Sequence, residues 1–151
     1  MHHAARRRAL AGALAGMAAM ASLVCPVWAA PPAVADGDAN DIRAVIEAQL
    51  AAFRADDAEL AFSFASPAIR AKFGVAGYFM AMVRGAYPVV YRPESVSFLL
   101  AQIVDDDVIQ RVRMTDRGGA AWLAIYRMQR QSDRQWRIDA CVVTRDNAQT
   151  A

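Results

Sequence analysis

The fold is decided by residues 108–144, which run VIQRVRMTDRGGAAWLAIYRMQRQSDRQWRIDACVVT. Two turn signals, the segment DRGG at 116–119 and the segment SDR at 132–134, divide this stretch into three parts. Within each part apolar and polar side chains alternate with a period of two, which is typical of half-buried β-strands. The stretch therefore predicts an antiparallel meander with strands at 108–115, 120–130 and 135–144.

The turns also predict the strand register. Three-residue loops at 116–118 and 131–133 are a common hairpin type, with Gly118 in the left-handed conformation. They predict three cross-strand pairs: Val112 with Trp122, Met128 with Trp136, and Tyr126 with Ile138. One sheet face would then carry Val112, Met114, Trp122, Ala124, Tyr126, Met128, Trp136, Ile138, Ala140 and Val142. The opposite face would carry Arg111, Arg113, Leu123, Ile125, Arg127, Arg137, Asp139, Cys141 and Val143.

The chain before the sheet has helical rather than alternating periodicity. Apolar residues recur every three or four positions through residues 42–53, and further helices are expected from Asp56, from Ser66-Pro67 to Gly74, and over 77–85. Residues 96–100 alternate again and lead into the acidic turn 105–107. Helices followed by strands predict an α+β fold, with N-terminal helices packed on a curved antiparallel sheet. Such a layer often encloses a pocket.

The first 29 residues have the composition of a secretory signal peptide. Arg6, Arg7 and Arg8 precede an apolar run over residues 9–24, and small residues surround Ala29. The run is shorter than the roughly 20 residues that a membrane-spanning helix needs. We expect cleavage after Ala29 and a periplasmic or secreted protein, with an uncleaved membrane anchor as the alternative. The predicted domains are a signal peptide at 1–29, a flexible linker at 30–39, one domain at 40–146 and a disordered tail at 147–151.

Removing this leader changes the chemistry that is available. Both histidines and Cys25 lie in the leader, and three of the 17 basic residues go with it, which leaves 14 against 15 acidic residues. The remaining chain has no His and one cysteine, Cys141, so we do not expect Ser-His-Asp or Cys-His catalysis. A zinc or copper site is not expected either, because the usual ligands are missing. It has no glycine-rich phosphate loop and no basic stripe for nucleic acid. We therefore expect no cofactor, no metal and no nucleic-acid partner.

Several short motifs resemble a known family. They are QLAAFRADD at 49–57, FASPAI at 64–69, KFG at 72–74, FMAMV at 79–83, YPVVYRP at 87–93 and WRI at 136–138. Together they resemble a bacterial exported family known as domain of unknown function 4864. The order of elements is also similar to the nuclear-transport-factor-2-like cone fold. The resemblance implies a fold and no activity, because the family offers no catalytic residues to carry over.

Six candidate ligand-binding side chains come from two places. They are Tyr87, Tyr91 and Arg92 in a segment bracketed by prolines, and Trp122, Tyr126 and Trp136 on one predicted sheet face. The first three are placed to meet a ligand at a pocket mouth, and the aromatic group to line a pocket for an apolar small molecule. The simpler interpretation, which we favour, is that these side chains pack on the rim and in the core of the fold.

The other sheet face is a candidate interface. Its candidate residues are Arg113, Leu123, Ile125, Arg127, Arg137, Asp139 and Cys141. An apolar centre with an arginine rim suits a protein interface, and the resemblance to cone-fold proteins implies a homodimer through this face. Within it we expect Asp139 to neutralise Arg127 and Arg137 across the strand pair.

Two functions remain open. The favoured one is an exported, non-catalytic module that binds a small ligand or another protein. The alternative is a small cofactor-free lyase or isomerase, in which a pocket carboxylate such as Asp139 acts as base and a tyrosine such as Tyr126 stabilises the oxyanion. The predicted register counts against this enzyme, since it places Asp139 and Tyr126 on opposite faces of the sheet.

Overall fold

The structure is a computed structural model that describes residue 30 and residues 32–149. The predicted signal peptide lies outside the described residues. Five helices come first: α1 (Asp36–Arg54), α2 (Ala58–Ser63), α3 (Pro67–Phe73), α4 (Ala76–Ala86) and α5 (Pro88–Tyr91). Strands β1 (Ser95–Phe98), β2 (Gln102–Val104), β3 (Asp107–Thr115), β4 (Ala121–Arg130) and β5 (Trp136–Arg145) follow, with a 3-10 turn at Asn147–Gln149. The prediction of an α+β fold is confirmed.

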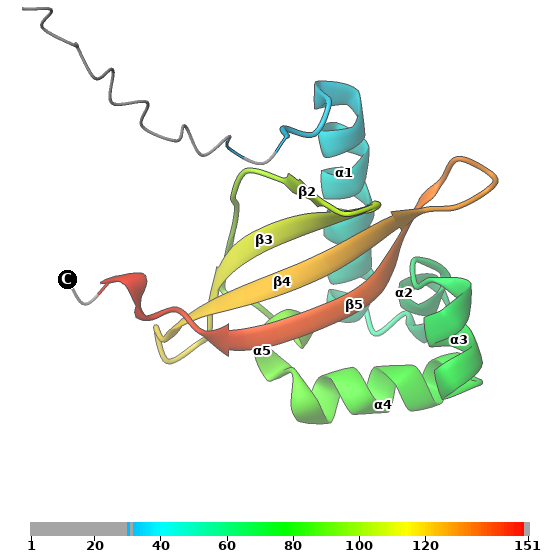
Figure 1. The fold of residues 1–151 in the computed structure, drawn as a ribbon. Coiled ribbons are helices and arrows are strands. Elements are labelled where there is room, and N and C mark those ends of the chain that lie inside the picture. The colour runs from blue at the N-terminus through cyan, green and yellow to red at the C-terminus, as the bar shows by residue number, and fades with distance from the viewer. Residues whose placement is uncertain (1–29, 31, 150–151) are drawn as a thin grey trace, which may run out of the picture.

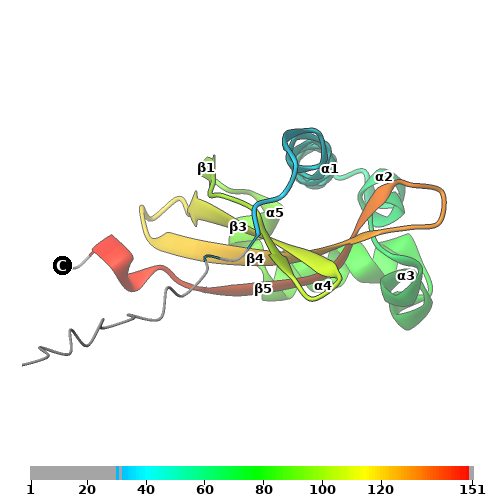
Figure 2. The same cartoon turned by 45° about the horizontal axis from the view of Figure 1, so that its top comes forward.

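The strands form one open, antiparallel, five-stranded sheet. Its order is β1-β3-β4-β5, and β2 also pairs with β3, so that β1 and β2 share one edge. In Figure 1, α1 crosses behind the strands and α4 runs alongside β5, and Figure 2 shows the same arrangement from another angle. The helices thus cover one face of the sheet. In the described part of the chain, none of the helices has the length and apolar character needed to cross a membrane.

The helix boundaries follow local capping chemistry. The first helix begins at Asp36, ahead of the predicted start, and acidic residues in its first turn suit the positive end of the helix dipole. Residues 36–39 are therefore helical rather than linker. The second helix is capped by Asp57 rather than by Asp56, from which it was expected, and the Asp57 carboxylate accepts from the Leu60 amide at 3.0 Å. The third helix is confirmed with Ser66 as cap, proline at its start and Gly74, at φ +77°, after its end.

The predicted register between β3 and β4 is wrong by two residues. Val112 pairs with Ala124, and Trp122 pairs with Met114. The turn is longer than predicted, because the Asp116 amide donates to the Ala120 carbonyl at 3.1 Å and Gly119, rather than Gly118, has the positive φ of +78°. A shift of two residues keeps each side chain on its predicted face.

The predicted pairs between β4 and β5 are also wrong. Ile138 pairs with Met128 and Trp136 with Arg130. Between Arg127 and Met128 the register changes, and Asp139 is the extra residue of a β-bulge.

Beyond this bulge the two faces of β5 exchange. Tyr126 pairs directly with Cys141, and Ala124 pairs with Val143. Directly paired residues share a face, so Cys141 and Val143 lie on the helix-covered side with Tyr126. Ala140 and Val142 lie on the uncovered side, which we call the outer face. The predicted faces of these four residues are therefore wrong.

The loop before α3 pairs with β5 next to the bulge. The Ser66 amide donates to the Ile138 carbonyl at 2.8 Å, and the Ile138 amide donates to the Phe64 carbonyl at 2.9 Å. This loop therefore pairs in parallel with β5 at Ala65 and Ile138. Ile138 keeps its pairing with Met128 on the β4 side, and the register changes directly after it, at Asp139.

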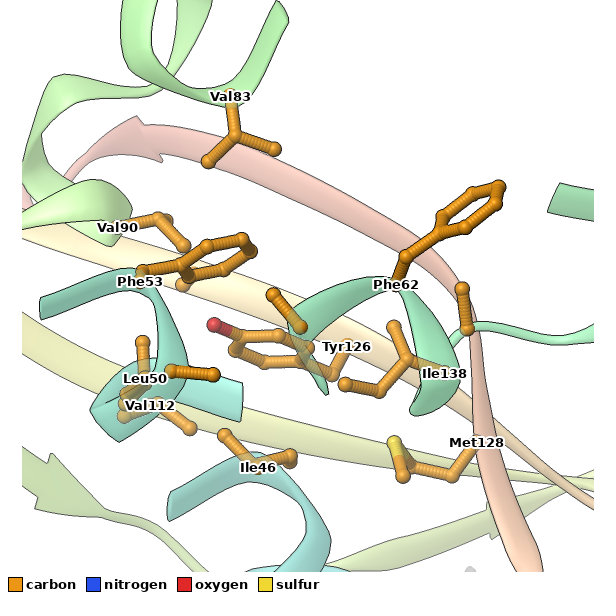
Figure 3. Packing of buried hydrophobic residues seen from close by; sticks show 14 of the residues in the cluster. Ile46, Leu50, Phe53, Phe62, Val83, Val90, Val112, Tyr126, Met128 and Ile138 are labelled. Carbon is orange, nitrogen blue, oxygen red and sulfur yellow. The ribbon is translucent and has the colours of Figure 1, made fainter. Parts of the chain in front are cut away.

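The core lies between α1, α4 and the covered face of the sheet. Its fully buried members include Ile42, Ile46, Phe53, Met114 and Tyr126. Figure 3 shows the ring of Tyr126 among side chains of both layers, with Leu50, Phe53 and Ile138 around it. Phe79 of α4 packs on Phe53 and Phe62, with ring centroids 6.0 and 5.3 Å apart. The core thus joins the two layers around one tyrosine.

Candidate functional site

A pocket of about 700 Å³ lies between the helices and the covered face of β4 and β5. We call it the inner pocket, and its volume is in the range of small-molecule sites. Its wall includes Gln49 and Phe53 from α1, Ile69, Lys72 and Phe73 from α3, Phe79, Met82 and Val83 from α4, and Tyr126, Arg127, Ile138, Asp139 and Cys141 from the sheet. Most of these side chains are apolar, so the pocket suits an apolar molecule.

Tyr126 is the unusual residue of this wall. Its side chain is fully buried, and among the described residues its hydroxyl is the one buried side-chain polar atom that has no hydrogen-bond partner. Buried polar groups are nearly always hydrogen-bonded. Burial raises the pKa of Tyr126 well above its ordinary value, so the hydroxyl stays protonated and neutral. The hydroxyl is therefore a neutral donor that has no oxygen or nitrogen partner among the described residues, and the weakly accepting sulfur of Cys141 is the polar group with which it interacts.

The thiol of Cys141 is the neighbour of this hydroxyl. The two residues pair across β4 and β5 as a result of the bulge. Burial raises the pKa of the Cys141 thiol to about 12, so the sulfur carries no charge at neutral pH. The sheet wall at Tyr126 is consequently polar but uncharged.

A charged network occupies the bulge. Asp139 is buried, and one of its carboxylate oxygens accepts a hydrogen bond from the Ser66 hydroxyl at 2.7 Å. The other oxygen accepts from the Arg127 guanidinium, which also lies 3.7 Å from Asp107. The Ser66 hydroxyl in turn accepts from the amide of Ile69 at 3.2 Å. Both carboxylate oxygens are therefore already engaged within the protein.

The predicted pairing of Asp139 with Arg137 is absent from this network. The Arg137 guanidinium lies 4.0 Å from Asp133 in the β4–β5 turn and donates to the Trp136 carbonyl at 3.0 Å. The bulge explains this, because Asp139 turns toward Ser66 on the covered side of the sheet. Arg127 alone of the two predicted arginines bonds to Asp139.

Four of the six candidate ligand-binding residues meet at a second pocket. This outer pocket has a volume of about 540 Å³, and its wall includes Tyr87, Tyr91, Arg92 and Trp122 together with Asp116 and Val143. Tyr87 also contributes to the inner pocket. The Pro-bracketed segment and the first hairpin of the sheet are thus brought together, although their polar atoms are engaged elsewhere.

Asp56 occupies the polar atoms of Tyr91 and Arg92. The Tyr91 hydroxyl donates to the Asp56 carboxylate, which also accepts from Arg92 at 2.9 Å and from Arg84 at 3.3 Å. The hydrogen bond from Tyr91, followed by the charges of Arg92 and Arg84, lowers the pKa of Asp56. The hydrogen bond with Tyr91 likewise raises the pKa of Arg92. Tyr91 and Arg92 therefore bind Asp56, and their polar atoms are engaged within the protein.

Trp122 is bound in a similar way. Its indole nitrogen donates to the Asp116 carboxylate at 2.8 Å, and the Arg145 guanidinium stacks 4.0 Å from its ring centroid. The hydrogen bond from Trp122, together with the amides of Ala120 and Gly118, lowers the pKa of Asp116. Trp122 therefore fixes the β3–β4 turn.

Trp136, the last of the six candidates, lies away from both pockets. It is buried at the start of β5, with its indole nitrogen 3.4 Å from Asp38 and the Arg130 guanidinium 5.5 Å from its ring. The predicted aromatic group is thus divided. Tyr126 lines the inner pocket, Trp122 the outer one and Trp136 neither.

The candidate interface is also divided. Leu123 and Ile125 are on the outer face with the exposed Val142, to which Ile125 is paired. Arg113 and Arg127 flank them on β3 and β4. The Arg113 guanidinium donates to the Asp146 carboxylate at 2.5 Å, and this hydrogen bond lowers the pKa of Asp146. Cys141 and Asp139 have left this face because of the bulge.

Among the residues that sequence reasoning missed, three bind candidate residues in or beside the two pockets. They are Ser66, which binds Asp139; Asp56, which binds Tyr91 and Arg92; and Asp116, which binds Trp122. Ser66 and Asp116 do carry local signals, as a helix cap and a turn residue, but their long-range partners follow from the register.

Among the described residues, no three His, Cys, Asp or Glu side chains form a group that could hold a metal ion.

Comparison with known proteins identifies the family. A family model described as "Domain of unknown function (DUF4864)" matches residues 35–151. No curated protein and no solved structure matches the chain. The matched region contains every helix and strand of the described structure, from Asp36 to Gln149. The chain therefore belongs to the family Domain of unknown function (DUF4864).

Proposed function

We propose that the protein is an exported, non-catalytic module that binds an apolar small molecule in the inner pocket. The observation that carries this proposal is the unpaired, fully buried hydroxyl of Tyr126 in the wall of a 700 Å³ pocket. A protein that only needed a core would be more stable with phenylalanine at this position, because a buried polar group without a partner is unfavourable. A helical layer over an open sheet with a pocket between them also supports the proposed nuclear-transport-factor-2-like cone.

One observation favours the alternative enzyme, and another counts against it. Asp139 and Tyr126 both line the inner pocket, because the bulge brings Asp139 to the covered side. However, the oxygens of Asp139 bind Ser66 and Arg127, and no hydrogen bond joins the carboxylate to Tyr126. A general base needs a lone pair directed at the substrate. The geometry therefore supports binding better than proton abstraction.

Fluorescence titration with the apolar dye 1-N-phenylnaphthylamine tests the proposed binding. The wild-type protein is expected to bind the dye with enhanced, blue-shifted emission. Met82→Trp places an indole in the inner pocket and should weaken binding about tenfold or more, because the buried area of the dye supplies most of the affinity.

Two controls make the titration decisive. Tyr78→Trp puts the same indole on the exposed side of α4, where the wild-type side chain is 63% exposed, and should leave dye binding unchanged. Arg117→Trp narrows the outer pocket and should also have no effect. Absence of binding to the wild type, or equal binding by Met82→Trp, would contradict the proposal.

Export is part of the proposal and has its own test. It is supported by the basic start, the apolar run and the small residues that end at Ala29. N-terminal sequencing of the protein from the periplasm or medium should begin at Ala30. Recovery of intact chains starting at Met1 in the membrane fraction would instead indicate a retained anchor.

We also propose that the outer face pairs with a second copy of the chain. The support is the apolar centre of Leu123, Ile125 and Val142, flanked by Arg113 and Arg127. Ile125→Asp should convert a dimer to a monomer in sedimentation velocity, while Ser97→Asp, on an exposed edge strand, should not. A monomeric wild type, or an unchanged sedimentation coefficient for Ile125→Asp, would refute the dimer.

A further inference from the structure

The unpaired hydroxyl of Tyr126 indicates what the ligand must carry. A phenol has one donor hydrogen and lone pairs that accept. In proteins, unused acceptor lone pairs are tolerated more often than donor hydrogens without an acceptor. The hydroxyl hydrogen of Tyr126 is therefore the group that most needs a partner. An acceptor atom on the bound molecule would supply one.

The charges around the pocket indicate that this acceptor is neutral. Two cations line the inner pocket, Arg127 and Lys72. The Arg127 guanidinium is already paired with Asp107 and Asp139. Lys72 is exposed to solvent, and its ammonium lies 5.7 Å from the ring of Phe73, with no ion-pair partner among the described residues. No described contact brings either of these cations to the Tyr126 hydroxyl, so an anion placed there would be desolvated without a paired charge beside it.

The neighbours of the hydroxyl are uncharged as well. In Figure 3, Phe53 and Leu50 lie at the hydroxyl end of Tyr126 and Ile138 at the opposite end, and Phe53, Val90 and Ile138 also line the inner pocket. The thiol of Cys141, which burial keeps protonated, is a polar group that interacts with the hydroxyl. A neutral oxygen is therefore the acceptor that this part of the wall can hold without a large loss of hydration energy.

Resting on the proposed binding function, we propose that the ligand of the inner pocket carries a carbonyl oxygen that accepts a hydrogen bond from Tyr126. The ligand class is an apolar ketone, aldehyde or ester small enough for a volume of about 700 Å³. The hydroxyl oxygen is shielded in the free protein, so the carbonyl reaches it by displacing a neighbouring side chain. The pocket wall includes Met82, an unbranched and partly buried residue of α4, and a thioether side chain of this kind changes conformation readily.

Three related probes test this assignment by isothermal titration calorimetry. They are 2-acetylnaphthalene, which has a carbonyl; 2-ethylnaphthalene, which lacks it; and 2-naphthoate, which is anionic. Tyr126→Phe should weaken binding of the ketone about threefold to tenfold, the range of one net hydrogen bond, and change binding of the hydrocarbon little. Comparing the variant with the wild type for each probe cancels the different hydrophobicities of the probes.

A spectroscopic measurement accompanies the titration. The infrared stretch of a ¹³C-labelled carbonyl in bound 2-acetylnaphthalene should lie at lower frequency in the wild type than in Tyr126→Phe. Tyr78→Phe removes an exposed hydroxyl and should change neither affinity nor frequency.

The outcomes separate this inference from the proposed function. If ketone and hydrocarbon both bind the wild type but Tyr126→Phe affects them equally, the carbonyl assignment is overturned and the binding function stands. If 2-naphthoate binds more tightly than the ketone and depends on Tyr126, the ligand is anionic and the assignment is again overturned. If neither neutral probe binds the wild type, the proposed function itself fails.

Discussion

Replacing Tyr126 with phenylalanine should make the free protein more stable. Most substitutions of a fully buried residue destabilise a protein. This one removes only an oxygen that has no hydrogen-bond partner, and it keeps the ring that packs among Phe53, Leu50 and Ile138. The unfolded chain loses the hydration of its hydroxyl, while the folded chain loses only van der Waals contacts and the weak interaction with the Cys141 thiol.

The size of the effect follows from the cost of an unsatisfied group. Burying a hydroxyl without a partner costs about 1 to 3 kcal/mol in proteins. Part of this is offset, because the oxygen still has van der Waals contacts and the thiol of Cys141 lies beside it. We therefore expect the free energy of unfolding to rise by about 1 kcal/mol, which corresponds to a rise in Tm of about 4 °C for a domain of this size.

Urea denaturation followed by tryptophan fluorescence measures this change. The midpoint should move to higher urea while the m-value stays constant. Tyr78→Phe, at an exposed position, should have no effect, and Tyr91→Phe should destabilise the protein because its hydroxyl binds Asp56. A loss of stability in Tyr126→Phe would mean that the hydroxyl has a partner in the free protein, and the argument for an unused donor would be refuted.

Three further predictions concern the groups around the pockets. Burial raises the folded pKa of Cys141 from 9.0 to about 12, so unfolding releases a proton between these two pH values. The free energy of unfolding should therefore fall as the pH rises above 9. In urea titrations between pH 8 and 11, Cys141→Ala should lose less stability than the wild type. Ser66→Ala removes a helix cap and a bond to a buried carboxylate, and it should lower the free energy of unfolding by about 2 kcal/mol. The control Ser63→Ala, at an exposed position, should have little effect. An equally small effect of Ser66→Ala would contradict this network. In Tyr91→Phe the pKa of Asp56, followed by NMR, should rise toward its ordinary value; an unchanged pKa would show that the arginines alone hold it down.

The class of the fold was accessible from the sequence because periodicity is local. The alternation in 108–115 and 121–130 and the cap at Ser66-Pro67 each depend on neighbouring residues, and both are present in the structure. The exact pairing was not accessible. The loop at 116–119 closes with Gly119 rather than Gly118 in the left-handed region, and one residue in a turn moves a whole strand.

The candidate site was harder to predict for a physical reason. The bulge at Asp139 lies next to Ile138, whose backbone bonds to a loop more than seventy positions earlier in the chain, and the Asp139 carboxylate bonds to Ser66 of the same loop. Nothing in the local pattern of β5 indicates it. Yet the bulge decides whether Cys141 and Asp139 lie beside Tyr126 or on the outer face, and thus whether the pocket has a polar wall.

The pairing of the loop at 64–66 with β5 also determines when the pocket can exist. Ser66 and Asp139 are separated by 73 positions, so their contact closes a long loop and forms late in folding. A chain that leaves a ribosome or a membrane channel with its N-terminus first can form its helices long before β5 is available. Until then it presents the apolar sides of α1 and α4 without the sheet that covers them. Such a nascent chain exposes apolar surface to its surroundings, and the inner pocket is complete only when the last strand has been delivered.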